Sequence, residues 1–148
     1  MKDIHRPAIL ESLEDLMTFV AECAEARGFR PKRIQEIQLA TEEALVNIFN
    51  YAYPENRDGE VRIECTPGEE NHLVIEFRDK GIPYRFKDLG KPDVSAPMAE
   101  REIGGLGIFL IRKMVDNVQF RREDDENILT FILQPRDQED DAEPQQPG

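Results

Sequence analysis

In the first third of the chain the sequence contains Ala40-Thr41-Glu42-Glu43-Ala44-Leu45-Val46-Asn47. We expect this segment to be the middle of a helix that begins near Pro31, because apolar residues recur around it at helical spacing. Glu43 and Asn47 are four residues apart, so the carboxylate and the amide lie on the same helix face. An amide oxygen can bind a hard cation, and a carboxylate can accept a proton. Alone, such a pair is more often a solvated helix face, so its meaning depends on the segments that follow.

The composition limits the class of protein. The 148 residues correspond to one domain, and 39% hydrophobic with 34% charged residues is typical of a globular chain. The net charge of −12 argues against nucleic acid or an anionic membrane surface as a partner, since phosphate binding needs clustered Lys and Arg. Cys23 and Cys65 are expected to be free thiols, and the isolated His5 and His72 predict no zinc site. Without a signal core or a long apolar run, we expect a cytoplasmic protein.

Apolar spacing predicts the elements around the central helix. An earlier helix is expected to begin with Ser12 and Asp15 as a capping box and to end at Gly28. Alternation predicts an edge strand at residues 2–8, a hairpin from 61–65 and 73–77, and two later strands at 118–120 and 128–133. Beyond Pro135 the chain is polar and acidic. We therefore expect a folded domain over 1–135 and a disordered tail over 136–148.

Two segments between the hairpin and the later strands bear most on function. Asp79-Lys80-Gly81 ends a predicted strand, and a lone Asp-x-Gly is usually a turn. Residues 85–103 show little periodicity and are expected to be either disordered or a functional lid loop. They lead into Gly104-Gly105-Leu106-Gly107 and a very apolar helix that includes Ile108 and Phe109. Glycines let a ligand approach the backbone and a helix N-terminus suits phosphate, although this pattern alone is a weak signal.

Taken in order, these segments resemble the GHKL ATPase superfamily, and within it the bacterial anti-sigma factor serine-protein kinases. The resemblance covers about residues 5–134 and rests on 40–47, on Asp79-Lys80-Gly81-Ile82-Pro83-Tyr84 and on 101–108. It implies an α+β fold of the Bergerat type. Such a fold is an α/β sandwich in which a mixed, mostly antiparallel sheet has helices packed on one face and carries a lid loop.

The resemblance also implies a role for each matching residue. Glu43 would be the general base, and Asn47 would ligate the Mg²⁺ ion that holds the phosphates of ATP. Asp79 would accept a hydrogen bond from the adenine amino group, and Gly81 would let the base approach the backbone. The other residues implied to bind the nucleotide are Arg101, Gly104, Gly105, Leu106 and Gly107.

Two functions of different kinds stay open, with a structural domain carrying chance motifs as a remote third. The first is an ATP-dependent kinase that phosphorylates a serine of a STAS-domain anti-anti-sigma protein and/or sequesters a sigma factor. The second is a nucleotide-gated protein-binding switch with little or no kinase activity. Three departures from the family pattern motivate it: Tyr51 replaces a histidine, Pro83 replaces a glycine, and Arg101 is displaced by two residues. A homodimer formed through the edge strand at 2–8 is a further expectation.

Overall fold

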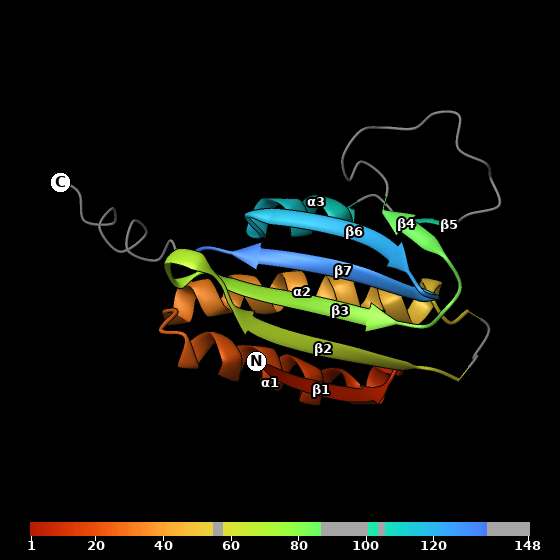
Figure 1. Ribbon diagram of the computed structural model, residues 1–148, viewed down its shortest axis with the longest axis horizontal. Helices are drawn as coiled ribbons and strands as arrows, with labels where there is room; N and C mark the ends of the chain where they lie inside the picture. The colour runs from red at the N-terminus through yellow and green to blue at the C-terminus, as the bar shows by residue number, and fades with distance from the viewer. Residues whose placement is uncertain (55–57, 87–100, 104–105, 136–148) are drawn as a thin grey trace.

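The computed structural model describes residues 1–54, 58–86, 101–103 and 106–135. Within these residues, one antiparallel sheet is covered on one face by three helices (Figure 1). The elements are, in chain order, β1 (Lys2–Pro7), α1 (Leu13–Ala26), α2 (Pro31–Tyr51), β2 (Glu60–Pro67), β3 (Leu73–Asp79), β4 (Tyr84–Phe86), β5 (Arg101–Ile103), α3 (Leu106–Met114), β6 (Asn117–Glu123) and β7 (Glu126–Leu133). Short 3₁₀ turns occur at Leu10–Ser12 and Glu69–Asn71.

The sheet has the strand order β1-β2-β3-β7-β6, and neighbouring strands are antiparallel. The predicted hairpin is confirmed as β2 and β3, and the predicted edge strand is β1, which ends at Pro7. We expected a mixed sheet, whereas the five-stranded sheet is antiparallel throughout. The described parallel pairing joins β4 to β5 in a separate two-stranded sheet.

The pairing of β4 with β5 also corrects the prediction of a loop over 85–103. Residues 84–86 and 101–103 pair with each other, while 87–100 lie outside the described residues. Three-residue strands are too short to show a period in the sequence, so their pairing could not be recognised there.

The core lies between the sheet and the helices. Side chains of alternate residues on β2, β3 and β7 point inward, and α1 and α2 add their predicted apolar stripes. Phe77 and Phe131 meet edge to face near the centre, with ring centroids 4.9 Å apart. Each fully buried aliphatic or aromatic side chain of this kind contributes about 1.5–3 kcal/mol to folding.

The ends of α1 show one wrong prediction and one that is confirmed. Ser12 forms no side-chain cap, because the preceding 3₁₀ turn gives it helical angles (φ −87°, ψ −8°) rather than the extended ones of a capping residue. At the other end Gly28 adopts φ +93°, and the N–H of Phe29 donates to the carbonyl of Ala24. This is the glycine stop that the sequence predicted.

The helix α3 is less uniformly buried than its composition suggested. Ile108 and Ile111 are buried against the core, whereas Phe109 is 60% exposed and lies under the ammonium group of Lys113. A nine-residue helix on the surface needs one apolar face only, so Phe109 points away from the core. None of the helices in the described ranges has the length and apolar character needed to cross a bilayer.

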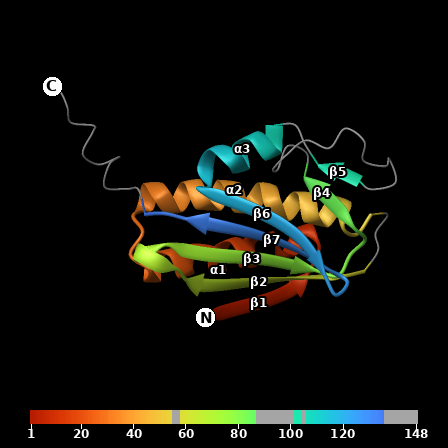
Figure 2. The same cartoon turned by 45° about the horizontal axis from the view of Figure 1, so that its top comes forward.

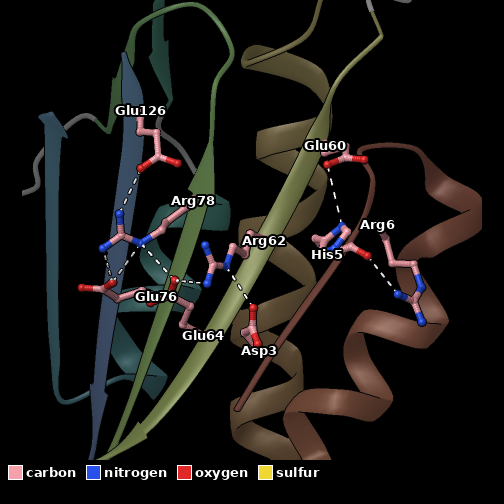
Figure 3. Close-up of polar contacts among 9 residues, drawn as sticks. All are labelled: Asp3, His5, Arg6, Glu60, Arg62, Glu64, Glu76, Arg78 and Glu126. Atoms are coloured by element: carbon pink, nitrogen blue, oxygen red, sulfur yellow. Dashed lines mark hydrogen bonds and ion pairs between the residues drawn. The ribbon is translucent and has the colours of Figure 1, made fainter. Parts of the chain in front are cut away.

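The face of the sheet without helices carries a network of ion pairs (Figure 3). Arg62 pairs with Asp3 and Glu64, and Arg78 pairs with Glu76 and Glu126, at 2.8–3.1 Å. These pairs are exposed or half-buried, and surface ion pairs contribute about 0–1 kcal/mol each, so they keep this face polar rather than hold the fold together. A hollow of about 650 Å³ opens here near the ends of β2 and β3, but the charges around it are largely paired with one another.

Candidate functional site

The sequence motifs converge at one end of the helical layer (Figures 1 and 2). The helix α3 lies beside α2 and runs in the opposite direction, so it begins next to the second half of α2. The strand β3 ends at Asp79 near the C-terminal end of α2, where the N–H of Ile82 donates to the carbonyl of Ala52 at 3.0 Å. The topology therefore brings the Asp-x-Gly turn, the end of α2 and the start of α3 together.

Glu43 and Asn47 lie on one face of α2, as their spacing predicts. Arg33 lies on the same side of α2, because it comes fourteen residues before Asn47, with Ala40 midway between them. The side chain of Arg33 donates to the carbonyl of Met114 at the end of α3. This contact shows that the face is turned toward α3. Within the described part of the chain, the half-buried side chains of Glu43 and Asn47 form no hydrogen bond or ion pair. Both are available to a ligand.

Asp79 is the most constrained polar group of the site. Its side chain is buried, with 2% of the residue exposed, and Oδ1 accepts hydrogen bonds from the N–H of Gly81 at 2.9 Å and from Nδ2 of Asn127 at 2.8 Å. The hydroxyl of Tyr84 donates to Oδ2 at 3.3 Å. Burial raises the pKa of Asp79, and these hydrogen bonds together with the charge of Arg122 oppose that rise. The site thus holds a buried carboxyl group whose Oδ2 keeps acceptor capacity.

Gly81 is required by the protein's own packing. A β carbon at this position would lie 2.3 Å from the carbonyl oxygen of Ala52, which no side chain could occupy without a shift of the backbone. The glycine therefore allows the turn after Asp79 to lie directly against the end of α2. Its implied role in the approach of a base stays a prediction.

The tyrosine hydroxyls fix the same turn from two sides. The Tyr53 hydroxyl accepts a hydrogen bond from the N–H of Lys80 at 3.0 Å and donates to the carbonyl of Glu60 at 2.8 Å. Burial raises the pKa of Tyr53, and it raises the pKa of Tyr84 well above its ordinary value. Both hydroxyls keep their protons and can act as donors.

The glycine-rich segment is only partly described. Gly104 and Gly105 lie outside the described residues. Leu106 and Gly107 begin α3, and Arg101 begins β5, which pairs with β4 and contacts α2. The backbone thus places three of the predicted residues beside the site. Their roles in ligand binding, like those of Gly104 and Gly105, stay predictions.

Two residues of the site were not predicted from the sequence. Asn127 is fully buried, and Arg122 donates both to its Oδ1 at 3.1 Å and to the carbonyl of Gly81 at 3.0 Å. A signal existed for Asn127, because it precedes Leu129 and Phe131 in the inward-facing register of β7. A polar residue in an otherwise apolar row of a strand needs a buried partner, which here is Asp79.

The donor set fits a hydrated Mg²⁺ ion better than a cation held by protein ligands alone. Among the described residues there is no cluster of three or more His, Cys, Asp or Glu side chains that could hold a metal. Asn47 offers a single amide oxygen beside the carboxylate of Glu43. Mg²⁺ commonly binds through few protein oxygens together with phosphates and water, so this arrangement suits it.

Comparisons with known proteins agree with this geometry. Residues 6–133 match the histidine kinase-like ATPase domain family. The chain is 31% identical over 143 residues to proteins described as serine-protein kinase RsbW from Bacillus thuringiensis (strain Al Hakam) and Bacillus cereus (strain AH820). These alignments cover 93% of this chain and 88% of each relative.

Solved structures show the same fold. The RsbU and RsbW domains of a Mycobacterium tuberculosis protein match with a TM-score of 0.61 at 12% identity, over 90% of this chain and 32% of that one. The histidine kinase domain of a blue-light activated histidine kinase from Erythrobacter litoralis matches with a TM-score of 0.54 at 17% identity, over 91% and 66% of the two chains. The predicted α/β sandwich is thereby confirmed.

The chain belongs to the histidine kinase-like ATPase family, the class that its fold and site define. Within that family it is a member of the group formed by the RsbW-type serine-protein kinases. Membership of this group makes it an ATP-dependent regulatory kinase domain, in agreement with the resemblance recognised in the sequence.

Proposed function

We propose that this chain binds Mg²⁺-ATP at the end of the helical layer and acts in the cytoplasm as a serine-protein kinase of the anti-sigma factor type. It phosphorylates a STAS-domain anti-anti-sigma protein, sequesters a sigma factor, or does both. Residues 1–135 form the catalytic domain, and 136–148 form an acidic tail outside it. The observation that carries this proposal is the buried Asp79, whose Oδ2 can accept a further hydrogen bond beside the C-terminal end of α2.

Asp79 selects a base that presents an amino group. An ionised carboxylate only accepts hydrogen bonds, and two donors already occupy Oδ1. The exocyclic amine of adenine is a donor of the matching kind, and a base with a carbonyl oxygen at that place would face Oδ2 with a second acceptor. Desolvation of an unmatched acceptor costs about 1–3 kcal/mol, which is enough to favour adenine.

The α2 residues act at the other end of the nucleotide. Asn47 ligates the Mg²⁺ ion, which supplies charge neutralisation for the phosphates when it is bound. Glu43 stands one turn before Asn47 and accepts the proton of the attacking serine hydroxyl. The serine oxygen then bonds to the γ-phosphorus while the bond to the bridging oxygen breaks and ADP leaves.

The start of α3 supplies hydrogen-bond donors to the phosphates. The first backbone N–H groups of a helix have no partner within it, and the positive end of the helix dipole favours an anion. Leu106 and Gly107 belong to this first turn. Arg101, Gly104 and Gly105 complete the proposed set.

The first test measures binding and transfer separately. Calorimetry with Mg²⁺-ATP and Mg²⁺-ADP should give affinities in about the micromolar range for the wild type. Purified STAS-domain proteins encoded near this chain are then incubated with ATP labelled at the γ-phosphate. Glu43→Gln should leave ADP affinity within about twofold and lower transfer by about 10²–10⁴-fold, because it removes the proton acceptor.

A matched control uses the neighbouring carboxylate. Glu42 is exposed and lies on a different side of α2, so Glu42→Gln removes the same charge away from the site. This variant should transfer label at the wild-type rate. Binding without transfer to any STAS-domain partner would favour the nucleotide-gated switch, and loss of both binding and transfer in the wild type would contradict the proposal.

A further inference from the structure

Three side chains stand in a row across the inner face of the sheet: Asp79 on β3, Asn127 on β7 and Arg122 on β6. The strand register places Asp79 opposite Asn127, and Asn127 opposite Arg122. Because β3, β7 and β6 are neighbours, the sheet itself fixes the separation of the three groups. The function proposed above gives no role to Asn127 or Arg122.

The hydrogen bonds of Asn127 define the orientation of its amide. Nδ2 donates to Oδ1 of Asp79 at 2.8 Å and to the carbonyl of Ile82 at 3.0 Å, so both of its protons are used. Oδ1 accepts from Nη1 of Arg122 at 3.1 Å. A flipped amide would point its oxygen at the carboxylate and its protons at the guanidinium group. Arg122, on the oxygen side of the amide, and the two acceptors on its nitrogen side together fix which way Asn127 faces.

Arg122 also holds the turn that follows Asp79. The same Nη1 atom donates to the carbonyl of Gly81 at 3.0 Å. One nitrogen thus joins the turn to the start of β7, while Arg122 as a residue remains exposed on the edge strand. A side chain that could extend freely into water instead reaches toward the buried network, where its bonds are charge-assisted.

The two carboxylate oxygens of Asp79 have different roles in this network. Oδ1 accepts two hydrogen bonds, from Gly81 and Asn127, which uses its lone pairs. Oδ2 faces the Tyr84 hydroxyl at 3.3 Å and retains room for another donor. The titratable and charged groups that act on this carboxyl are Tyr84 of β4, Arg122 of β6 and Tyr53 after α2. Arg122 supplies the positive charge among them.

We propose that Asn127, oriented by Arg122, is a positioning residue for Asp79: the pair holds Oδ1 inside the sheet and keeps Oδ2, with its negative charge, for the amino group of a nucleobase. This inference rests on the proposed function, because it takes Asp79 as the acceptor for the base. It adds that the edge strand β6, far from Asp79 in the sequence, controls the strength of base binding.

The first experiment measures ADP affinity across pH for Arg122→Gln, with Arg121→Gln as a matched control. Arg121 lies one residue away on the opposite face of β6, where it pairs with exposed Glu123. Every affinity is divided by that of the wild type at the same pH, so that protonation of ADP itself cancels. Arg122→Gln should bind about tenfold more weakly near neutral pH, and its binding should be lost on acidification at a higher pH than in the wild type. Arg121→Gln should show neither effect.

In a second variant, Asn127→Asp, binding should weaken toward alkaline pH rather than toward acidic pH. The new carboxylate takes the place of an amide nitrogen that lies 2.8 Å from Oδ1 of Asp79. At mildly acidic pH the two carboxyl groups share one proton and can keep the native hydrogen bond, whereas at alkaline pH both ionise and repel each other. The affinity relative to the wild type should therefore fall by about tenfold or more between about pH 6 and about pH 9.

The outcomes separate this inference from the proposed function. A wild type that does not bind ADP overturns both. If the wild type binds but the affinities of Arg122→Gln and Asn127→Asp relative to it do not vary with pH, Asn127 has a packing role only and this inference is wrong while the proposed function stands. Circular dichroism checks the fold of each variant. If Asn127→Asp is unfolded, the exposed Arg122→Gln decides the matter alone.

Discussion

Gly81 lies so close to Ala52 that a β carbon at position 81 would be 2.3 Å from the Ala52 carbonyl oxygen and 2.6 Å from its β carbon. The same carbonyl accepts a hydrogen bond from the N–H of Ile82 at 3.0 Å. The turn after Asp79 and the C-terminal end of α2 are therefore locked to each other. Any side chain at position 81 must push them apart or break that hydrogen bond.

We predict that Gly81→Ala weakens ADP binding together with the fold. Overpacking of a fixed backbone contact costs about 1–3 kcal/mol of stability, which a urea titration measures. Displacement of Asp79 from α2 should lower the ADP affinity by about tenfold or more, which calorimetry measures, because an acceptor must stay within hydrogen-bond distance of its donor.

Gly28→Ala is the control for this prediction. Gly28 has φ +93° and open space around it, so alanine there costs about 1–2 kcal/mol through backbone strain alone. It ends α1, away from the turn at Asp79, and should leave ADP affinity unchanged. Equal ADP affinities for Gly81→Ala and the wild type would show that the lock between the turn and α2 does not position the site.

We predict that Asp79→Asn strongly weakens nucleotide binding without loss of stability. The amide oxygen can replace Oδ1 as acceptor from Gly81 and Asn127, and the amide nitrogen can donate to the Tyr84 hydroxyl. The same nitrogen would face the amino group of adenine donor to donor. ADP affinity should fall by about a hundredfold or more, since an unmatched buried donor costs about 1–3 kcal/mol on each side.

The pH dependence of unfolding provides a second readout for Asp79→Asn. The pKa of Asp79 is raised in the folded protein, chiefly by burial, so the unfolded chain gives up this proton more readily. The contribution of Asp79 to stability is therefore fully present below the unfolded pKa and is lost as the pH rises through the folded pKa. Asp79→Asn should remove this dependence and be at least as stable as the wild type at neutral pH. Lower stability of the variant at neutral pH would contradict this account.

Local patterns made much of this structure predictable. The spacing of Ile37, Ala44 and Ile48 defines the buried face of α2, and it therefore also defines the face on which Glu43 and Asn47 lie. The alternation of Val61, Ile63 and Cys65 does the same for β2, with the partner strand after a short turn. In each case the repeat of apolar residues falls within the element itself, so a short stretch of sequence is enough to recognise it.

The parts that could not be predicted depend on long-range pairing. Asn127 is a site residue because the register of β7 against β3 places it opposite Asp79, which is 48 residues earlier. The capping role expected of Ser12 failed because a 3₁₀ turn precedes α1, and the exposure of Phe109 depends on which face of α3 meets α2. Spacing along the chain contains no information about these choices.

We predict that Arg33 is the most destabilising charged residue to remove. Arg33 is fully buried and donates to Asp116 at 2.6 Å, to the carbonyl of Met114 at 2.7 Å and to the carbonyl of Gln134 at 2.9 Å. It thus ties the start of α2 to the ends of α3 and β7. Arg33→Met should cost about 3–5 kcal/mol in urea unfolding, because Asp116 and the two carbonyls would each lose a hydrogen bond from a buried cation.

Asp116→Asn serves as the comparison and should destabilise the protein less than Arg33→Met. Its side-chain oxygen can still accept from the N–H of Gln134 and from Arg33, so two hydrogen bonds persist and only the charge is lost. We expect a cost of about 1–2 kcal/mol. Equal costs for Arg33→Met and Asp116→Asn would mean that the ion pair alone matters and that the bonds of Arg33 to the two carbonyls contribute nothing.

We predict that Cys23 reacts with iodoacetamide faster than Cys65. The two buried thiols of α1 and β2 face each other, and their mutual hydrogen bond acts on both pKa values. This bond, assisted by the charge of Lys2, lowers the pKa of Cys23, whereas the same bond and burial raise the pKa of Cys65. Since the thiolate is the reactive form, the rate of alkylation at Cys23 should reach half its maximum at a lower pH than that of an ordinary cysteine.

Substitution of Cys65 tests the cause of this reactivity. Cys65→Ala removes the hydrogen bond and should shift the pH midpoint of alkylation at Cys23 upward, with a rate near neutral pH that is several-fold lower, about threefold to tenfold. Cys65→Ser fills the same place with a hydroxyl that can still donate, so it should keep the midpoint near that of the wild type. Mass spectrometry of the alkylated peptides assigns each rate. An unchanged midpoint in Cys65→Ala would show that Lys2 and the surrounding charges, rather than the second thiol, set the reactivity of Cys23.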